Sequence, residues 1–149
     1  RVEEAYFGTG GAPVLRSDGG YHRLTQAFDE RGSRVEWAHF GPDGEPTLHE
    51  DGYHRLTQAF DQRGNLVEQV YFGTDGYPVL LPSGGYHRAI WIFDEWDNSV
   101  EWAFFGVRGE PVLRSDGGYH RATLSYDLGG NRTGWSLYGV DGELLGSSE

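Results

Sequence analysis

The chain has 149 residues, a usual length for a single domain with a core of its own. Its 23 acidic and 12 basic residues leave a net charge of −11, which disfavours binding to nucleic-acid phosphates and to anionic lipid. Cys is absent, which excludes disulfides and thiolate metal sites, and no apolar run approaches the roughly 18 residues of a membrane-spanning helix. Neither nucleic acid nor a membrane is therefore an expected partner.

The composition favours short β-strands joined by tight turns. Aromatic residues make up 15% of the chain and Gly contributes 24 residues, whereas hydrophobic residues reach only 37%. Aromatic side chains suit a pleated surface, and Gly suits the turns between strands. The same composition does not suit a helical bundle, so we expect an all-β fold.

A motif of 32 or 33 residues repeats along the whole chain. A Val-Glu pair starts at Val2, Val35, Val67 and Val100, and a Gly-Tyr-His-Arg element follows each pair. Self-similarity at a fixed period is typical of repeat architectures, in which each unit packs against its neighbours. We therefore expect one repeat domain, residues 1–149, with units at residues 2–34, 35–66, 67–99 and 100–132 and a half unit at 133–149.

The first complete hairpin is expected from residue 21 to residue 40. Residues 21–28 contain no Gly or Pro and predict a strand, and residues 34–40 predict its return strand. Between them, Asp29 opens a three-residue loop, and Gly32 supplies the positive φ that a type I turn with a G1 bulge requires. The later loops carry, at the position of Gly32, the residues Gly64, Asp97 and Gly130.

Further turns are expected after each return strand. Residues 41–44 have the sequence Gly-Pro-Asp-Gly, which predicts a second tight turn, and residues 45–48 are a candidate for a short third strand. A Ser-Asp-Gly-Gly stretch, at residues 17–20 and again at 115–118, is then expected to redirect the chain toward the next hairpin.

The loop predicts the register of the hairpin and hence its two faces. A three-residue loop pairs Asp29 with Ser33. An uninterrupted ladder then places on one face the pairs Phe28–Arg34, Gln26–Glu36, Leu24–Ala38 and His22–Phe40. The other face carries Tyr21 and the pairs Arg23–His39, Thr25–Trp37 and Ala27–Val35. The Phe positions repeat more strictly than the Trp37 position. We therefore expect the Phe face to point inward, with Phe40 in the core. The alternative is that the Trp37 face points inward, since both faces carry apolar groups.

Neighbouring hairpins are expected to stack, because no single unit can bury its apolar face alone. The result would be an open solenoid or meander of hairpins, and the alternative is a small closed ring of propeller-like blades. Residues 133–149 are expected to cover the edge that the fourth hairpin leaves, and residues 2–8 are expected to cover the opposite edge.

The repeated polar residues argue against catalysis and metal binding. The His residues of successive Gly-Tyr-His-Arg elements would lie roughly 10 Å apart, too far to share one metal ion. We expect each His to pack against a Phe and to hydrogen-bond a loop carbonyl, and Tyr21 to stack on Arg23. The carboxylates recur in every unit, whereas a catalytic pair occurs once. The chain is therefore not expected to be an enzyme, and no catalytic residue, metal ligand or cofactor is predicted.

The hairpin loops resemble those of two bacterial repeat families. Residues 60–65, Phe-Asp-Gln-Arg-Gly-Asn, look like the hairpin of bacterial YD repeats. Residues 71–76, Tyr-Phe-Gly-Thr-Asp-Gly, are similar to the aromatic-then-Asp-Gly hairpins of bacterial cell-wall- and glucan-binding repeats. Both families form β-structures from hairpins and occur in large surface or secreted proteins. The resemblance therefore implies a secreted or cell-surface location.

The aromatic residues favour a binding module. Exposed rings on a β surface are expected to contact a glycan or a protein, and the candidates are Trp37, Trp102, Trp135, Tyr6 and Tyr71. A departure from the repeat is where a unique site is expected, and Trp91 and Trp96 make the third unit the most aromatic. The alternative is a spacer or shell segment of a larger bacterial surface or secreted protein, without a ligand. Association of two copies through their repeats is a third option.

Overall fold

The computed structural model describes residues 2–7, 9–16 and 20–148. Its regular elements are ten strands: β1 (Val2–Ala5), β2 (Arg23–Phe28), β3 (Arg34–Phe40), β4 (Arg55–Phe60), β5 (Leu66–Phe72), β6 (Arg88–Phe93), β7 (Ser99–Phe105), β8 (Arg121–Tyr126), β9 (Arg132–Tyr138) and β10 (Leu144–Ser147). No helix long and apolar enough to cross a membrane occurs in the described part of the chain.

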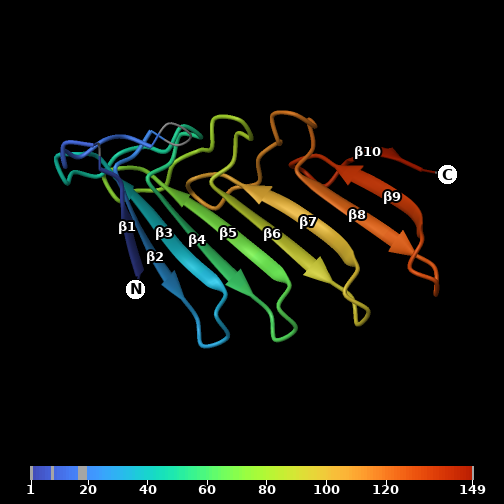
Figure 1. Ribbon diagram of the computed structural model, residues 1–149. Coiled ribbons are helices and arrows are strands. Elements are labelled where there is room, and N and C mark those ends of the chain that lie inside the picture. The colour runs from blue at the N-terminus through green and yellow to red at the C-terminus, as the bar shows by residue number, and fades with distance from the viewer. Residues whose placement is uncertain (1, 8, 17–19, 149) are drawn as a thin grey trace.

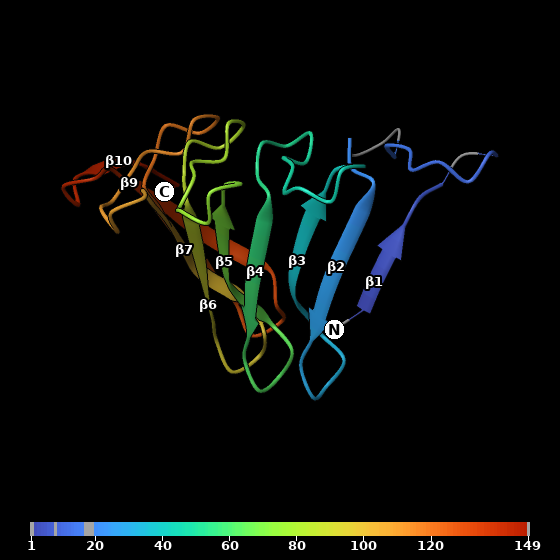
Figure 2. The ribbon, with the colours of Figure 1, turned by 90° about the vertical axis from the view of Figure 1, so that its left-hand side faces the viewer.

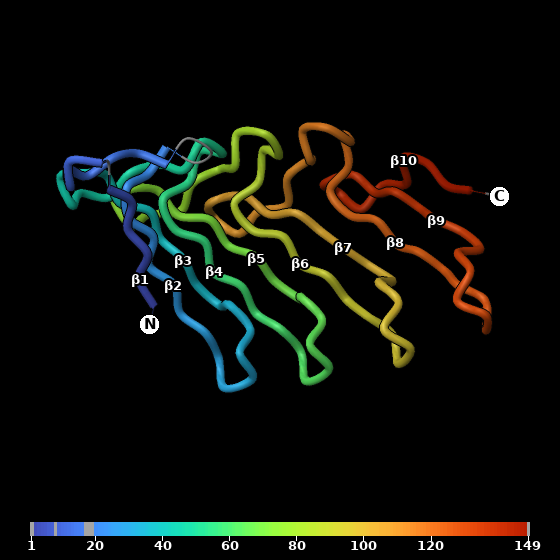
Figure 3. Tube along the Cα trace, viewed as in Figure 1, coloured from blue at the N-terminus to red at the C-terminus, as the bar shows by residue number. Residues whose placement is uncertain are grey.

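All ten strands belong to one open antiparallel sheet in which spatial order follows chain order (Figure 1). The expected all-β meander is confirmed. The closed ring is wrong, because β1 and β10 lie at opposite ends of the sheet and do not pair with each other. Figure 3 follows the chain back and forth from one end of this sheet to the other.

The two ends of the strands carry different connections. Tight hairpin loops gather at one end and long connections at the other (Figure 2). In the first tight loop, the N–H of Asp29 donates to Ser33 O at 2.9 Å, and Asp29 Oδ1 accepts the N–H of Arg31, also at 2.9 Å. The predicted positive φ is confirmed at Gly32 (83°) and at Asp97 (66°). The Asp at the start of each loop and the left-handed residue near its end therefore define the hairpin.

The predicted register is correct at the loop and wrong beyond it. Phe28 pairs with Arg34, but Ala27 already pairs with Glu36, so Val35 is an extra residue in β3. This β-bulge shifts every later pair by one position, and the same shift follows the loops of the other three hairpins. A one-residue slip turns the remaining side chains of a strand to the opposite face.

The bulge therefore reverses the predicted orientation of the return strand. Leu24 pairs with His39 and Gln26 pairs with Trp37. We call the face with these four residues, and their counterparts in other units, the inner face. The prediction was right for β2 and wrong for β3. It was also wrong for the two residues before β2: Tyr21 contacts His39 on the inner face, and His22 packs edge to face on Phe7, the counterpart of Phe40. Phe40 lies on the opposite, outer face instead of in the core.

Units are linked on the outer face by a repeated group of Arg, Glu, Phe and His. The Arg55 guanidinium lies 4.0 Å from the centre of the Phe72 ring of the following unit and 3.3 Å from the Glu36 carboxylate of its own unit. His87, which precedes the next hairpin, meets Phe72 edge to face at 5.5 Å. The predicted His–Phe packing is confirmed. The predicted stack of Tyr21 on Arg23 is wrong, because Arg23 lies over Phe40.

The long connections fold back over the inner face. The turn at residues 41–44 is confirmed, since the N–H of Gly44 donates to Gly41 O at 3.0 Å. The third strand at residues 45–48 is wrong: Pro46 forms only an isolated bridge to Phe40, and the chain then leaves the sheet. Leu81 of a later connection is buried against the inner face. Of the Ser-Asp-Gly-Gly stretch at 17–20, only Gly20 is among the described residues, with a φ of 72°.

The end segments pair as the sequence predicts. β9 is the antiparallel partner of β8, and β1 is the partner of β2. β10 adds one more strand along β9, which extends the cover at that end. Gly8, the last residue of the predicted N-terminal cover, lies outside the described residues.

The left-handed loop glycines should each contribute to stability. Gly32→Ala, Gly64→Ala and Gly130→Ala are expected to lower the free energy of unfolding by about 1 kcal/mol, because a Cβ is unfavourable at their φ values of 83°, 87° and 80°. No atom lies within 4 Å of the added Cβ at these positions, so backbone strain alone should set the cost. Urea unfolding measures it.

Gly10→Ala is the matched control, since Gly10 also has open space around an added Cβ but no positive φ. Losses of equal size in the control and the three loop variants would contradict the strain argument.

Candidate functional site

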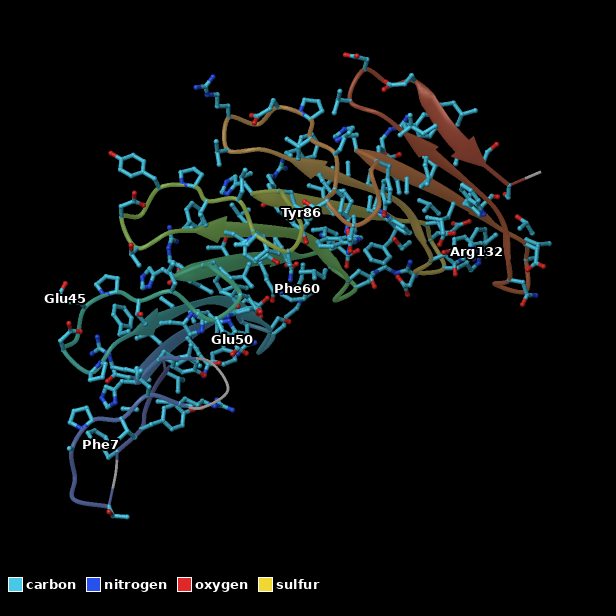
Figure 4. The ribbon with its side chains drawn as sticks, turned by 90° about the horizontal axis from the view of Figure 1, so that it is seen from above. Phe7, Glu45, Glu50, Phe60, Tyr86 and Arg132 are labelled. Carbon is cyan, nitrogen blue, oxygen red and sulfur yellow. The ribbon has the colours of Figure 1, made fainter. Side chains whose placement is uncertain are left out.

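A continuous row of packed aromatic rings crosses the inner face beside the long connections. Neighbouring ring centres are 4.6–6.0 Å apart along the series Tyr6, Tyr21, His39, Tyr53, Tyr71, Tyr86, Phe104 and Tyr119. We call this series the aromatic row. In Figure 4, Tyr86 lies near the middle of the fan of strands, and Phe7 marks the β1 end. The row therefore links every repeat unit to the next.

Two positions of the repeat supply the row. One ring comes from the Tyr of each Gly-Tyr-His-Arg element, and the other from the second-last residue of β3, β5 and β7 and from the corresponding Tyr6 after β1. Most of the ring pairs are edge-to-face or tilted, an arrangement worth about 0.5–1.5 kcal/mol per pair beyond the area it buries. The long connections add further contacts, as where Arg16 donates to the hydroxyls of Tyr6 and Tyr21 at 2.9 and 3.0 Å.

The part of the inner face near β2–β4 is polar. The Arg34 guanidinium lies 3.8 Å from the centre of the Trp37 ring and donates to Gln26 Oε1 at 3.0 Å. The Trp37 indole N–H lies 3.4 Å from the Tyr53 hydroxyl. These side chains and His39 border a recess of about 320 Å³. Its hydrogen-bonding groups are thus largely engaged with one another.

His39 is the most perturbed titratable group of this recess. Only 2% of its surface is exposed, and burial lowers the pKa of His39 from 6.5 to about 4, although its Nδ1 lies 3.1 Å from His54 O. The nearby His49 ring, 4.8 Å away, also disfavours a charge on His39. His39 is therefore a neutral member of the aromatic row at neutral pH.

The part of the inner face near β6–β9 is apolar and open. Two recesses of about 230 and 400 Å³ adjoin there and share Trp102. We call them together the apolar groove, which is lined by Leu66, Trp91, Phe93, Ser99, Trp102, Ala122, Leu124, Arg132, Trp135 and Leu137. Figure 4 shows Arg132 toward the C-terminal end of the fan. The long connections cover the aromatic row but leave this surface accessible.

The five predicted ligand contacts fall in different places. Trp102 and Trp135 meet in the apolar groove, where Trp135 is 38% exposed. Trp37 and Tyr71 are only 9% and 6% exposed, so their expected exposure is wrong. Tyr71 belongs to the aromatic row, and Arg34 covers Trp37. Tyr6 is half-buried at the β1 end of the same row.

The sequence prediction missed most of the groove lining. Phe93 and Leu124 belong to it, yet the predicted register placed them on the face opposite Trp102 and Trp135. Trp91 carried a signal, since it replaces the Gln26 and Gln58 of earlier units. A predicted register that included the bulge would have placed these side chains on the same face as Trp102 and Trp135.

Comparison with protein-family models and a search of curated proteins gave no match. Within the described residues, no three His, Cys, Asp or Glu side chains converge as metal ligands. The open inner face is therefore the basis for a functional proposal.

His39 should make stability depend on pH. The unfolded chain binds a proton at this His below about pH 6.5, whereas the folded chain does so only near pH 4. Acidification through this window therefore favours unfolding, by about 3 kcal/mol in total. His39→Phe should lose less stability than the wild type between pH 7 and pH 4 in urea titrations. Phe is a matched replacement, because Phe104 holds the equivalent place in the aromatic row. Parallel stability curves for the two proteins would contradict the assignment.

Proposed function

We propose that the chain is a non-catalytic binding module whose apolar groove holds an apolar segment of a protein partner. The observation that carries this proposal is the convergence of Trp91, Trp102 and Trp135 on one accessible surface of the inner face. Large exposed apolar surfaces with aromatic residues are typical of protein interaction sites. Among the described residues, the strands form one sheet and no second sheet covers this surface, which supports a role for a partner.

The lining of the groove favours a protein over a glycan. A sugar bound on a Trp ring also needs polar side chains around the ring to satisfy its hydroxyl groups. Among the ten lining residues, only Arg132 and Ser99 are polar beyond the indole N–H groups. The Trp102 indole N–H already donates to the Tyr119 hydroxyl at 3.0 Å. An apolar peptide segment needs few such partners.

A structural spacer is the second candidate. Burial of Trp37 and Tyr71 within the sheet and its connections supports it. The outer-face contacts also repeat at each junction between units, as expected of a building element. In this case the groove would have no ligand.

Selection from a phage-displayed peptide library tests the proposal. Peptides selected on the wild-type protein should carry aromatic or aliphatic residues, and Trp135→Ser should weaken their affinity about tenfold or more, as expected of a central interface residue. Trp96→Ser is the matched control, because Trp96 is 65% exposed in a hairpin loop outside the groove.

Equal affinities for the two variants would contradict a peptide site in the groove. A glycan-array screen of the same proteins distinguishes the other candidates. Glycan binding that depends on Trp135 would indicate a sugar ligand, and the absence of selected peptides and glycans would favour the spacer.

A further inference from the structure

β1 is a return strand without its hairpin partner among the described residues. Its sequence, Val-Glu-Glu-Ala, corresponds to the start of the repeated return strands β3, β5, β7 and β9. Each of those four strands pairs along one edge with its own hairpin partner and along the other edge with the following strand. β1 is the first strand of the sheet and pairs only with β2, the strand that follows it. Its other edge is the position that a hairpin partner occupies elsewhere.

The missing contacts can be identified from the other units. In each complete hairpin, the N–H of a His donates to the carbonyl of the aromatic residue that ends the return strand, at 2.8–2.9 Å. The next residue, an Arg, lies over that aromatic ring at 4.0–5.3 Å. Phe7 is the corresponding residue after β1, and it is 60% exposed, whereas Phe40, Phe72 and Phe105 are half-buried.

We propose that the free edge of β1 is a binding site for an unpaired extended segment with the pattern Tyr-His-Arg-Leu-Thr-Gln, the sequence of a first strand of this repeat. The pairing of β4 with β5 provides its register. Transferred to β1, the Arg of the segment lies opposite Phe7, the Leu opposite Tyr6 and the Thr opposite Ala5. The Tyr of the segment then extends the aromatic row beyond Tyr6. Such strand addition uses main-chain hydrogen bonds for affinity and side-chain pockets for specificity.

Charge favours this occupant over a second copy of β1. Glu3 and Glu4 are exposed in β1, so two copies paired edge to edge would bring like charges together. A segment with an Arg opposite Phe7 brings the opposite charge instead. The described first strands β2, β4, β6 and β8 have both edges paired in the folded chain and are not available as donors.

The other end of the sheet differs from this edge. β10 pairs with the edge of β9 that faces away from β8. In the preceding return strands β3, β5 and β7, the same edge pairs with the next first strand, β4, β6 or β8. Ser147 pairs with Ser136, which is the counterpart of Ala38 in β3. The site that a following strand would use is thus filled at the β9 end, whereas no described strand occupies the hairpin-partner side of β1.

An extended chain tests the proposal. A copy of residues 52–65 placed directly before Arg1 supplies one first strand and its hairpin loop in the order found in the other units. The extension is expected to raise the melting temperature by several degrees and to slow amide exchange in β1, relative to an extension of the same composition in shuffled order. Equal melting temperatures and exchange rates for the two extended chains would overturn the proposal.

The Arg contact provides a sharper control. Arg55→Ala within the added copy should reduce the rise in melting temperature when Phe7 is present, and should have a smaller effect when the chain also carries Phe7→Leu. A synthetic peptide of residues 52–61 should shift the NMR signals of residues 2–7 in the unextended chain. An Arg55→Ala effect that is the same in both backgrounds, or peptide-induced shifts only at the β10 end, would overturn the proposed register.

Discussion

One extra residue after each hairpin loop determines which side chains the sheet buries. The bulge residue is Val35 in β3, and Val67, Val100 and Thr133 hold its place in the later return strands. Without it, Trp37 and His39 would lie on the face opposite Leu24. With it, the ring at the second-last position of β3, β5 and β7 meets the Tyr of the next Gly-Tyr-His-Arg element. The aromatic row and the groove both depend on this shift.

The hairpin loops could be predicted from the sequence because their geometry is local. The Asp29 carboxylate accepts a hydrogen bond from a backbone N–H of its own loop, and Gly32 has a positive φ. Asp97 likewise has a positive φ in the third hairpin. The bulge could not be predicted in this way. Val35 is an ordinary strand residue, and its displacement selects which face of β3 points inward. That choice depends on contacts between residues far apart in the sequence.

Strict repetition was a misleading guide to burial. The Phe40 position repeats closely because each ring lies between an Arg of its own hairpin and the His that precedes the next hairpin, on the outer face. The inner face tolerates more change, since the Gln26 position becomes Trp91 and then Leu124. This variation divides the inner face into a polar part near β2–β4 and the apolar groove near β6–β9. The predicted binding residues Trp102 and Trp135 lie in the groove, whereas Tyr6 and Tyr71 help to hold the units together.

Adjacent residues of one strand provide the most direct test of the inner-face assignment. Phe104 is 2% exposed in the aromatic row, and Phe105 lies on the outer face beneath Arg88. Phe104→Ala should lower the free energy of unfolding by about 3–5 kcal/mol in urea titrations, the usual cost of removing a buried ring, and Phe105→Ala should cost clearly less. A larger loss at Phe105 than at Phe104, or equal losses at both, would contradict the account of the bulge and of the core that depends on it.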